Sequence, residues 1–175
     1  MGLRARVYDR LKAQQYAENW WNGANPHYLF FATDDCTNFV SQCLVAGGMP
    51  MLYTGKRASG WWYKGKSGSQ ELWSYSWAVA NALQLYLHSA NNGSVAFRVD
   101  SPQQLTIGDV ICYDWNGDGR YQHSAFVTSV NENGMPLVNA HTVESRNRLW
   151  DYRDSYAWTE QTRYSYLKIA DVFSL

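Results

Sequence analysis

The segment 34–48 constrains most strongly what this chain can fold into. Its apolar positions recur with the spacing of one helix face, and they are Cys36, Phe39, Val40, Cys43 and Leu44. A stripe of this kind predicts a helix that lies on a hydrophobic core. Asp34 or Asp35 can cap the start of this helix, and Gly47 with Gly48 supplies its C-terminal stop.

Cys36 falls in the first turn of the predicted helix. Unpaired backbone N–H groups and the positive end of the helix dipole favour a thiolate there, so Cys36 is a candidate nucleophile. A catalytic cysteine also needs a base to take its proton and a third group to hold that base. The available histidines are His27, His88, His123 and His141.

The other two cysteines, Cys43 and Cys112, lie in apolar stretches and are interpreted as small buried hydrophobes. Cys36 and Cys43 are two turns apart on one helix, about 10 Å along its axis, which is too far for a disulfide. The three cysteines also lack the C-x-x-C spacing of a metal site.

The composition excludes some classes of partner. The chain has 175 residues, and its 15 Lys+Arg balance its 15 Asp+Glu. This length suits one domain with a real core, and the absence of a basic run argues against a nucleic-acid partner. No apolar run is long enough to span a membrane, and the N-terminus lacks the core of a signal peptide. We expect a soluble monomer, either on its own or as a domain of a longer exported protein.

Helical periodicity comes first along the chain, and strand-like patterns follow. The expected elements, besides the helix of Cys36, are helices over 4–22 and 70–90 and strands over 110–113, 123–130, 136–142 and 163–169. Val79, Leu83, Tyr86 and Leu87 mark the expected buried face of the helix over 70–90, which Asn91-Asn92-Gly93 would end. Helices followed by antiparallel strands predict an α+β domain.

The segments 123–130 and 136–142 flank a turn and predict a β-hairpin that carries two of the histidines. A four-residue turn places His123 opposite Thr142, with His141 one step away. Asn139 shares a strand face with His141. The hairpin thus offers one base and two candidates for the group that orients it. Strict register puts His123 and His141 on opposite faces, and a shift by one residue would reverse this facing.

Two further features allow a functional and a structural interpretation. Asp114, Asn116 and Asp118 match the first half of a calcium-binding EF-hand loop, but Ala125 stands where the bidentate Glu belongs. The alternative is a glycine-rich turn without a cation. The aromatic loop over 49–70 and the residue Trp73 either line a substrate groove or cover the core. The tryptophans concerned are Trp61, Trp62 and Trp73.

The stretch 35–42 with the glycines at 47 and 48 resembles the signature of the bacterial amidase domain family, a branch of the papain-like cysteine hydrolases. Further matching segments are Tyr8-Asp9-Arg10, Tyr16-Ala17, Asn25-Pro26-His27-Tyr28, Ser76-Trp77, Gly108-Asp109-Val110-Ile111, His123-Ser124-Ala125-Phe126-Val127 and Ala140-His141-Thr142. The order of a helix cysteine, a Gly-Asp strand and two strand histidines is similar to NlpC-type and CHAP-type peptidoglycan hydrolases. The resemblance implies one papain-like α+β domain over residues 1–175, with N-terminal helices packed on a small antiparallel sheet.

The same resemblance implies roles for individual residues. Cys36 would be the nucleophile, His123 the general base and acid, and His141 the residue that orients His123. Asn139 is the alternative orienting residue, because papain-like enzymes often use an asparagine there. The backbone N–H of Cys36 would contribute to the oxyanion hole, with Tyr28 or Asp34 as candidates for an additional side chain.

The function that follows is hydrolysis of an amide or peptide bond through a thioester, without a cofactor or metal. The resemblance points to a cell-wall peptide as substrate and to a secreted or cell-wall-associated location. Two alternatives remain open. One is an acyltransferase that passes the same thioester to an amine, and the other is a catalytically inactive wall-binding module whose Trp-rich loop supplies the affinity.

Overall fold

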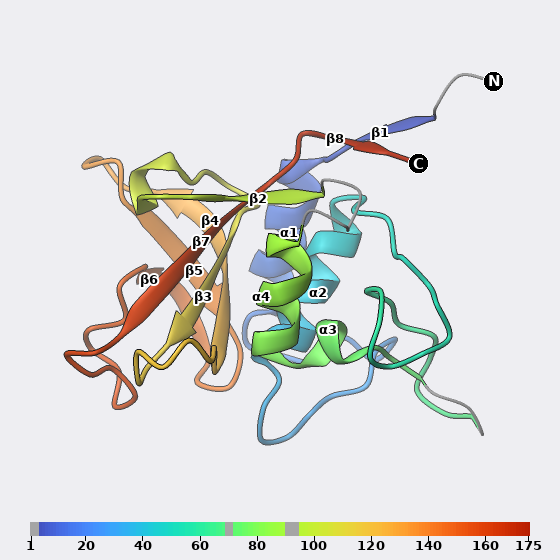
Figure 1. The fold of residues 1–175 in the computed structure, drawn as a ribbon. Helices are drawn as coiled ribbons and strands as arrows, with labels where there is room; N and C mark the ends of the chain where they lie inside the picture. The colour runs from blue at the N-terminus through green and yellow to red at the C-terminus, as the bar shows by residue number, and fades with distance from the viewer. Residues whose placement is uncertain (1–3, 69–71, 90–94) are drawn as a thin grey trace.

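The computed structural model describes residues 4–68, 72–89 and 95–175. The helices are α1 (Arg10–Trp20), α2 (Cys36–Ala46), α3 (Tyr75–Ala78) and α4 (Ala80–His88), with a short 3-10 helix at Pro102–Gln104. The strands are β1 (Ala5–Val7), β2 (Ala96–Val99), β3 (Val110–Asp114), β4 (His123–Val130), β5 (Pro136–Ala140), β6 (Ser145–Leu149), β7 (Arg163–Ile169) and β8 (Val172–Ser174). Figure 1 shows the helices gathered beside a twisted sheet.

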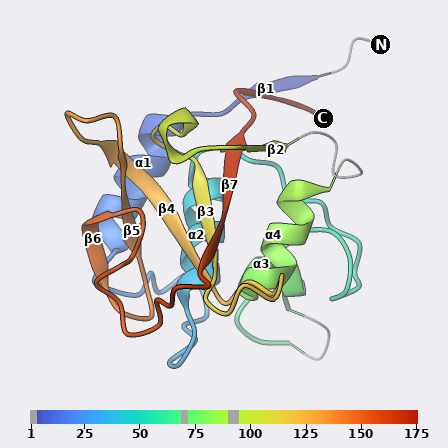
Figure 2. The same cartoon turned by 60° about the vertical axis from the view of Figure 1, so that its left-hand side comes forward.

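The main sheet is antiparallel and has six strands in the order β2-β7-β3-β4-β5-β6. The helices lie against one face of it, while β5 and β6 curl away at the far edge (Figures 1 and 2). Strands β1 and β8 form a separate pair near the two termini. The architecture is therefore α+β, as the order of helical and strand-like patterns predicts.

Helix α2 begins at Cys36 and occupies the centre of the helical layer. The predicted apolar stripe is fully buried, and the polar residues between its members are buried as well. These polar side chains have partners: Thr37 Oγ1 lies 3.1 Å from Ser124 Oγ, and Ser41 Oγ donates to Trp77 O at 2.8 Å. Because every side of the helix is covered, the position of Cys36 is fixed by contacts all around it.

The first and third helices differ from their predicted bounds. Helix α1 starts only at Arg10, after the N-cap Asp9, because residues 5–7 pair with β8 instead. Of the predicted helix 70–90, residues 72–89 are described, and these form α3 and α4 separated at Val79. Val79 has extended backbone angles and is 44% exposed, so its predicted burial is wrong. The carbonyl of Trp77 accepts from Ser41 rather than from the next helical turn, which favours the break.

The predicted hairpin is present with the predicted register near the site. Phe126 faces Asn139 and Val127 faces Val138, and an irregularity between Val127 and Ser129 shifts the pairing toward the turn. Cys112 pairs with Ser124. Ser124 contacts α2. Because side chains alternate along a strand, the residue before it, His123, faces the opposite side of the sheet.

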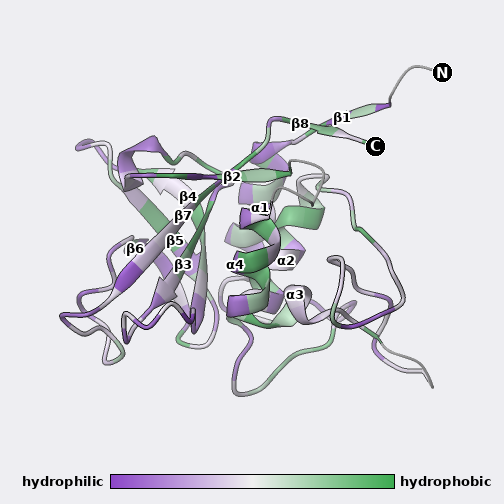
Figure 3. Cartoon of the chain, viewed as in Figure 1, coloured by the Kyte–Doolittle hydropathy of each residue, from purple (hydrophilic) through white to green (hydrophobic). Residues whose placement is uncertain are grey.

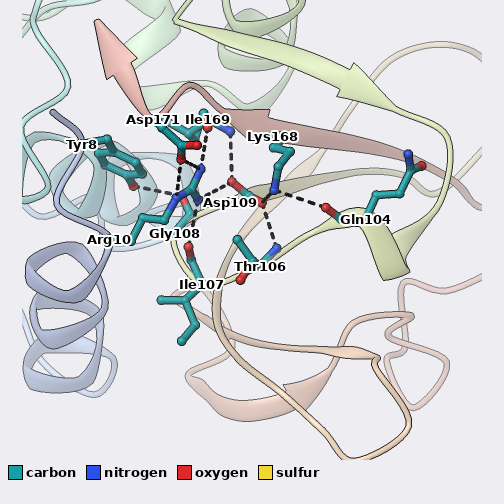
Figure 4. A network of polar contacts seen from close by, with 10 residues as sticks. All are labelled: Tyr8, Arg10, Gln104, Thr106, Ile107, Gly108, Asp109, Lys168, Ile169 and Asp171. Carbon is teal, nitrogen blue, oxygen red and sulfur yellow. Dashed lines mark hydrogen bonds and ion pairs between the residues drawn. The ribbon is translucent and has the colours of Figure 1, made fainter. Parts of the chain in front are cut away.

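An ion-pair network joins the start of α1 to the sheet (Figure 4). Arg10 Nη1 lies 2.7 Å from Asp109 Oδ1, and the Asp109 carboxylate is completely buried. The same carboxylate accepts from the backbone N–H groups of Thr106 and Ile169 and from Lys168 Nζ. A buried carboxylate with this many donors is satisfied, so this network is structural.

Hydrophobic residues gather along α4 and the central strands, whereas the loops at the edges of the sheet are mostly hydrophilic (Figure 3). One core cluster lies between the helices and the sheet, and a second lies on the other face around Tyr113 and Tyr152. Within the described ranges, none of the helices has the length and hydropathy needed to cross a bilayer.

Candidate active site

Cys36 lies at the N-terminus of α2, where the sequence places it. Its thiol donates to Asp34 Oδ1 at 3.4 Å and lies 3.7 Å from Thr37 Oγ1. The side chain is 1% exposed. Asp34 itself is exposed, so a surface carboxylate covers a buried thiol.

Burial, and after it the negative charge of Asp34, raise the pKa of the Cys36 thiol to about 12. The expected thiolate is therefore absent from this state of the protein. The helix N-terminus does favour a thiolate, but the loss of solvation and the adjacent carboxylate outweigh it.

His123 is the first residue of β4 and lies among aromatic rings. Its Nε2 is 3.0 Å from the hydroxyl of Tyr152, and the rings of Tyr113 and Trp115 flank it at 5.4 and 6.0 Å. Burial lowers the pKa of His123 to about 3, and the nearby Arg148 cation acts in the same direction. The imidazole is thus neutral at physiological pH.

Cys36 and His123 are not hydrogen-bonded to each other in the part of the chain that the structure describes. They are linked through a pocket of about 150 Å³ whose lining residues are Asp34, Trp115, Gln122, His123, Thr142, Val143, Arg148, Tyr152, Ser155 and Ala157. Two of these lining residues, Asp34 and Thr142, also contact Cys36 directly. Cys36 is not itself a lining residue, but it contacts two residues of the pocket whose wall contains His123.

His141 does not orient His123, contrary to the expectation from the resemblance. Its Nδ1 lies 2.5 Å from Asp35 Oδ2, its Nε2 lies 2.6 Å from the carbonyl of Trp20, and its ring stacks on Phe39 at 4.2 Å. Both partners of the ring nitrogens are hydrogen-bond acceptors, so neither nitrogen of His141 is free. His141 is committed to a buried ion pair on the helix side of the sheet.

Asn139 does not contact His123 either. Its Oδ1 accepts from Thr128 Oγ1 at 3.1 Å and from the N–H of Asn147 at 3.0 Å, and its Nδ2 donates to Glu18 at 3.1 Å. This set of partners ties β5 to the strand on each side and to α1. Neither of the two predicted orienting residues reaches the candidate base.

The backbone N–H of Cys36, expected in the oxyanion hole, already has an acceptor. It donates to Thr142 Oγ1 at 3.2 Å, and the N–H of Asp35 donates to the same oxygen at 3.1 Å. Thr142 has a φ of 81°, an unfavourable conformation for a β-branched residue. The threonine hydroxyl thus accepts from two adjacent N–H groups at the start of α2.

Of the two side chains considered for the oxyanion hole, Asp34 lines the pocket and Tyr28 does not. Tyr28 packs in the helical layer, with its ring 5.0 Å from Tyr63 and 5.9 Å from Trp77. A carboxylate such as Asp34 accepts hydrogen bonds and does not donate them when ionised. Asp34 is therefore better suited to hold the thiol proton than to stabilise an oxyanion.

The remaining candidates have structural roles. Asp114 is buried, and its carboxylate accepts from four backbone N–H groups of the loop over 116–119, which stabilises this turn. Trp61 and Trp62 are buried in the core, and so are Cys43 and Cys112. Among the described residues, no cluster of three or more His, Cys, Asp or Glu could hold a metal ion.

Sequence reasoning missed Tyr152 and Arg148, which contact or influence His123. They belong to the segment 142–152, which also holds all three non-glycine residues with positive φ in the described chain, namely Thr142, Asn147 and Tyr152. No sequence pattern marks Tyr152, because it stands in a turn between β6 and β7 rather than in a periodic element.

A model of the family described as "Putative amidase domain" matches residues 7–167. The chain belongs to this family. Membership of this amidase family indicates hydrolysis of an amide bond, and the match spans both arms of the hairpin and the helix of Cys36.

Two relatives come from Bacillus subtilis (strain 168). The chain is 51% identical to "Uncharacterized protein YhbB" over 168 residues, which cover 96% of this chain and 52% of that protein. It is 30% identical to "Uncharacterized protein YjcM" over 147 residues, which cover 80% of this chain and 32% of that protein. The amidase domain thus spans about half or less of these relatives. No solved structure matches the chain.

Proposed function

We propose that this amidase-family domain is a cysteine-dependent hydrolase of amide or peptide bonds, built on a papain-like fold and acting through a thioester. The observation that carries the proposal is the pocket that joins His123 to the residues covering Cys36. A buried thiol at a helix N-terminus, an imidazole and two backbone N–H groups are the parts that acyl transfer needs.

In the first half of the reaction, the thiol proton of Cys36 passes to Nδ1 of His123 while Sγ attacks the carbonyl carbon of the substrate. The oxyanion takes the place of Thr142 Oγ1 at the N–H of Cys36. The imidazolium of His123 then gives its proton to the nitrogen of the leaving amine, the C–N bond breaks, and a thioester with Cys36 remains.

In the second half, His123 takes a proton from water while the water oxygen attacks the thioester carbonyl. The C–S bond breaks, the acid leaves, and the proton returns to the sulfur of Cys36. His123 can serve in both steps because it gives its proton to the leaving amine before the water attacks, so Nδ1 is again free to accept a proton.

The resting contacts indicate that substrate must displace a cover before the thiol reacts. Asp34 and Thr142 contact Cys36 from above, and both are exposed. Displacement of the Asp34 carboxylate also removes a charge that raises the pKa of the thiol. A cell-wall peptide is the substrate that we propose, with the domain acting as a monomer without a cofactor.

The test uses a panel of peptide amides and cell-wall peptides, with product analysis by mass spectrometry. Wild type is expected to release an amine and an acid, and C36A is expected to abolish this release. C43A and C112A provide matched controls, since both cysteines are buried like Cys36 but have no part in the proposed mechanism. Hydrolysis that persists in C36A would exclude the cysteine mechanism, and transfer to an added amine instead of water would identify an acyltransferase.

A covalent probe gives a second test that does not need the natural substrate. A peptide bearing an electrophilic ketone or vinyl sulfone should label Cys36 faster than Cys43 or Cys112. Simple iodoacetamide is a poorer probe, because the resting thiol is buried and protonated. Equal labelling of all three cysteines would indicate unfolding rather than catalysis.

A further inference from the structure

We propose that Tyr152 is the positioning residue of His123, in the role that the sequence assigned to His141 or Asn139. This inference rests on the proposed function of Cys36 and His123. The hydroxyl of Tyr152 lies 3.0 Å from Nε2 of His123, and both side chains are buried. The opposite ring nitrogen, Nδ1, has no hydrogen-bond partner among the described residues, so it remains available for the proton of Cys36.

Tyr152 is held firmly enough to act in this way. Its ring lies 4.7 Å from that of Tyr113, and the guanidinium of Arg148 stacks over it at 4.0 Å. Arg148 is fixed in turn by Asp154 and by Ser145. Tyr152 has a φ of 57°, which is rare for a bulky residue and is kept only when the surroundings determine it.

A tyrosine hydroxyl can accept a hydrogen bond from Nε2–H and thereby fix the tautomer of His123. In that tautomer Nδ1 carries the lone pair that a base requires. Burial raises the pKa of Tyr152 to about 12, so the hydroxyl stays neutral when the imidazole becomes charged. Tyr152 therefore orients the ring without adding the negative charge that an aspartate would bring.

The other polar residues near His123 are engaged elsewhere. Gln122 Oε1 accepts from the N–H of Trp115 at 2.9 Å, and Asp34 accepts from Cys36. Among the described residues, Tyr152 supplies the one side-chain hydrogen bond to the ring of His123. Tyr152 is therefore the residue whose contact can orient the imidazole of His123.

The experiment compares Y152F with Y166F, a matched loss of a hydroxyl from the same core cluster. The first measurement is the ¹⁵N chemical shifts of the His123 ring, identified by their absence in H123Q. Wild type and Y166F should show one tautomer with the proton on Nε2, whereas Y152F should show a mixture. This readout needs no substrate, and a change in folding alone would not move it selectively.

The second measurement is the pH profile of amide hydrolysis. Loss of one neutral hydrogen bond predicts a fall in kcat of about tenfold in Y152F with KM little changed, and a shifted acidic limb of the profile. An unchanged tautomer and pH profile in Y152F, with C36A inactive, would overturn the role of Tyr152 alone. Activity that persists in C36A would overturn the proposed function and with it the catalytic meaning of this contact.

Discussion

His123 is the first residue of β4 and His141 directly follows β5, the other arm of the same hairpin, yet the two meet opposite surroundings. His141 faces the helices, where an aspartate and a backbone carbonyl accept from its two nitrogens. His123 faces the other side of the sheet, where neutral aromatic rings and one hydroxyl surround it. The first environment offers an acceptor to each ring nitrogen, and the second disfavours a charged ring.

This difference assigns the two histidines to different tasks. A ring whose two nitrogens are both engaged by acceptors leaves neither nitrogen for a substrate, so His141 is suited to joining the start of α2 to the end of β5. A neutral ring with one free nitrogen can accept a proton, so His123 is suited to general-base catalysis. The residue type is the same in both places, and the acceptors around it determine what it does.

The largest expected effect separates the two histidines by activity. H123A should reduce amide hydrolysis by about 10²- to 10⁴-fold, because it removes the general base. Among the described residues the variant loses one side-chain hydrogen bond, to Tyr152, so we expect it to remain folded. Steady-state kinetics and circular dichroism measure the two quantities. Full activity in H123A would reassign the base, with Asp34 as the next group to test.

The next effect separates the two histidines by stability. H141A leaves Asp35 buried with one oxygen unpaired, and the loss of one partner of a buried pair costs about 3 kcal/mol or more. Urea unfolding should show this loss, and H27A, at an exposed position, should show none. The folded fraction of H141A should keep a measurable kcat. A stable but inactive H141A would return His141 to the catalytic machinery.

The sequence predicts those parts of the fold that depend on local periodicity. The helix of Cys36 and the strands over 123–130 and 163–169 have their predicted bounds. The hairpin register near Phe126 also follows from the turn length. Strand β6 was missed because its sequence, Ser145–Leu149, is mostly polar and exposed at the edge of the sheet, so it shows no apolar alternation.

The site was less predictable because its contacts join distant parts of the chain. Thr142 and Tyr152 reach Cys36 and His123 only after β6 has folded back along β5. The burial of Cys36, which raises the pKa of its thiol, was unpredictable for another reason, since helix position is visible in the sequence and complete burial is not. Which of the two hairpin histidines keeps a free ring nitrogen likewise depends on the residues that pack on each face of the sheet, and these come from distant parts of the chain.

A smaller effect concerns the pH dependence of stability. The pKa of His123 is about 3 in the folded protein, below its ordinary value of 6.5, because burial disfavours the charged ring. Between these values the unfolded chain binds a proton that the folded chain does not. The contribution of His123 to the free energy of unfolding should therefore be at its maximum above about pH 6.5 and should decline as the pH falls below this value.

H123N tests this linkage because it keeps a polar side chain but does not titrate. Urea unfolding across the same pH window should show that the free energy of unfolding declines less steeply with falling pH in H123N than in wild type. The difference in slope should correspond to the uptake of up to one proton on unfolding. H88N, which removes a more exposed histidine, should leave the slope close to that of wild type. Equal slopes for H123N and wild type would mean that His123 is protonated in the folded protein.

The smallest effect concerns the cover over Cys36. T142G removes the hydroxyl that occupies the N–H groups of Asp35 and Cys36, and it suits the φ of 81° at this position. Alkylation of Cys36 should become a few-fold faster, whereas T142S, which keeps the hydroxyl, should match wild type. The rates at Cys43 and Cys112 are internal controls for unfolding. If T142G leaves the rate at Cys36 unchanged, Asp34 alone limits access to the thiol, and the strained threonine supports the hairpin rather than covering the nucleophile.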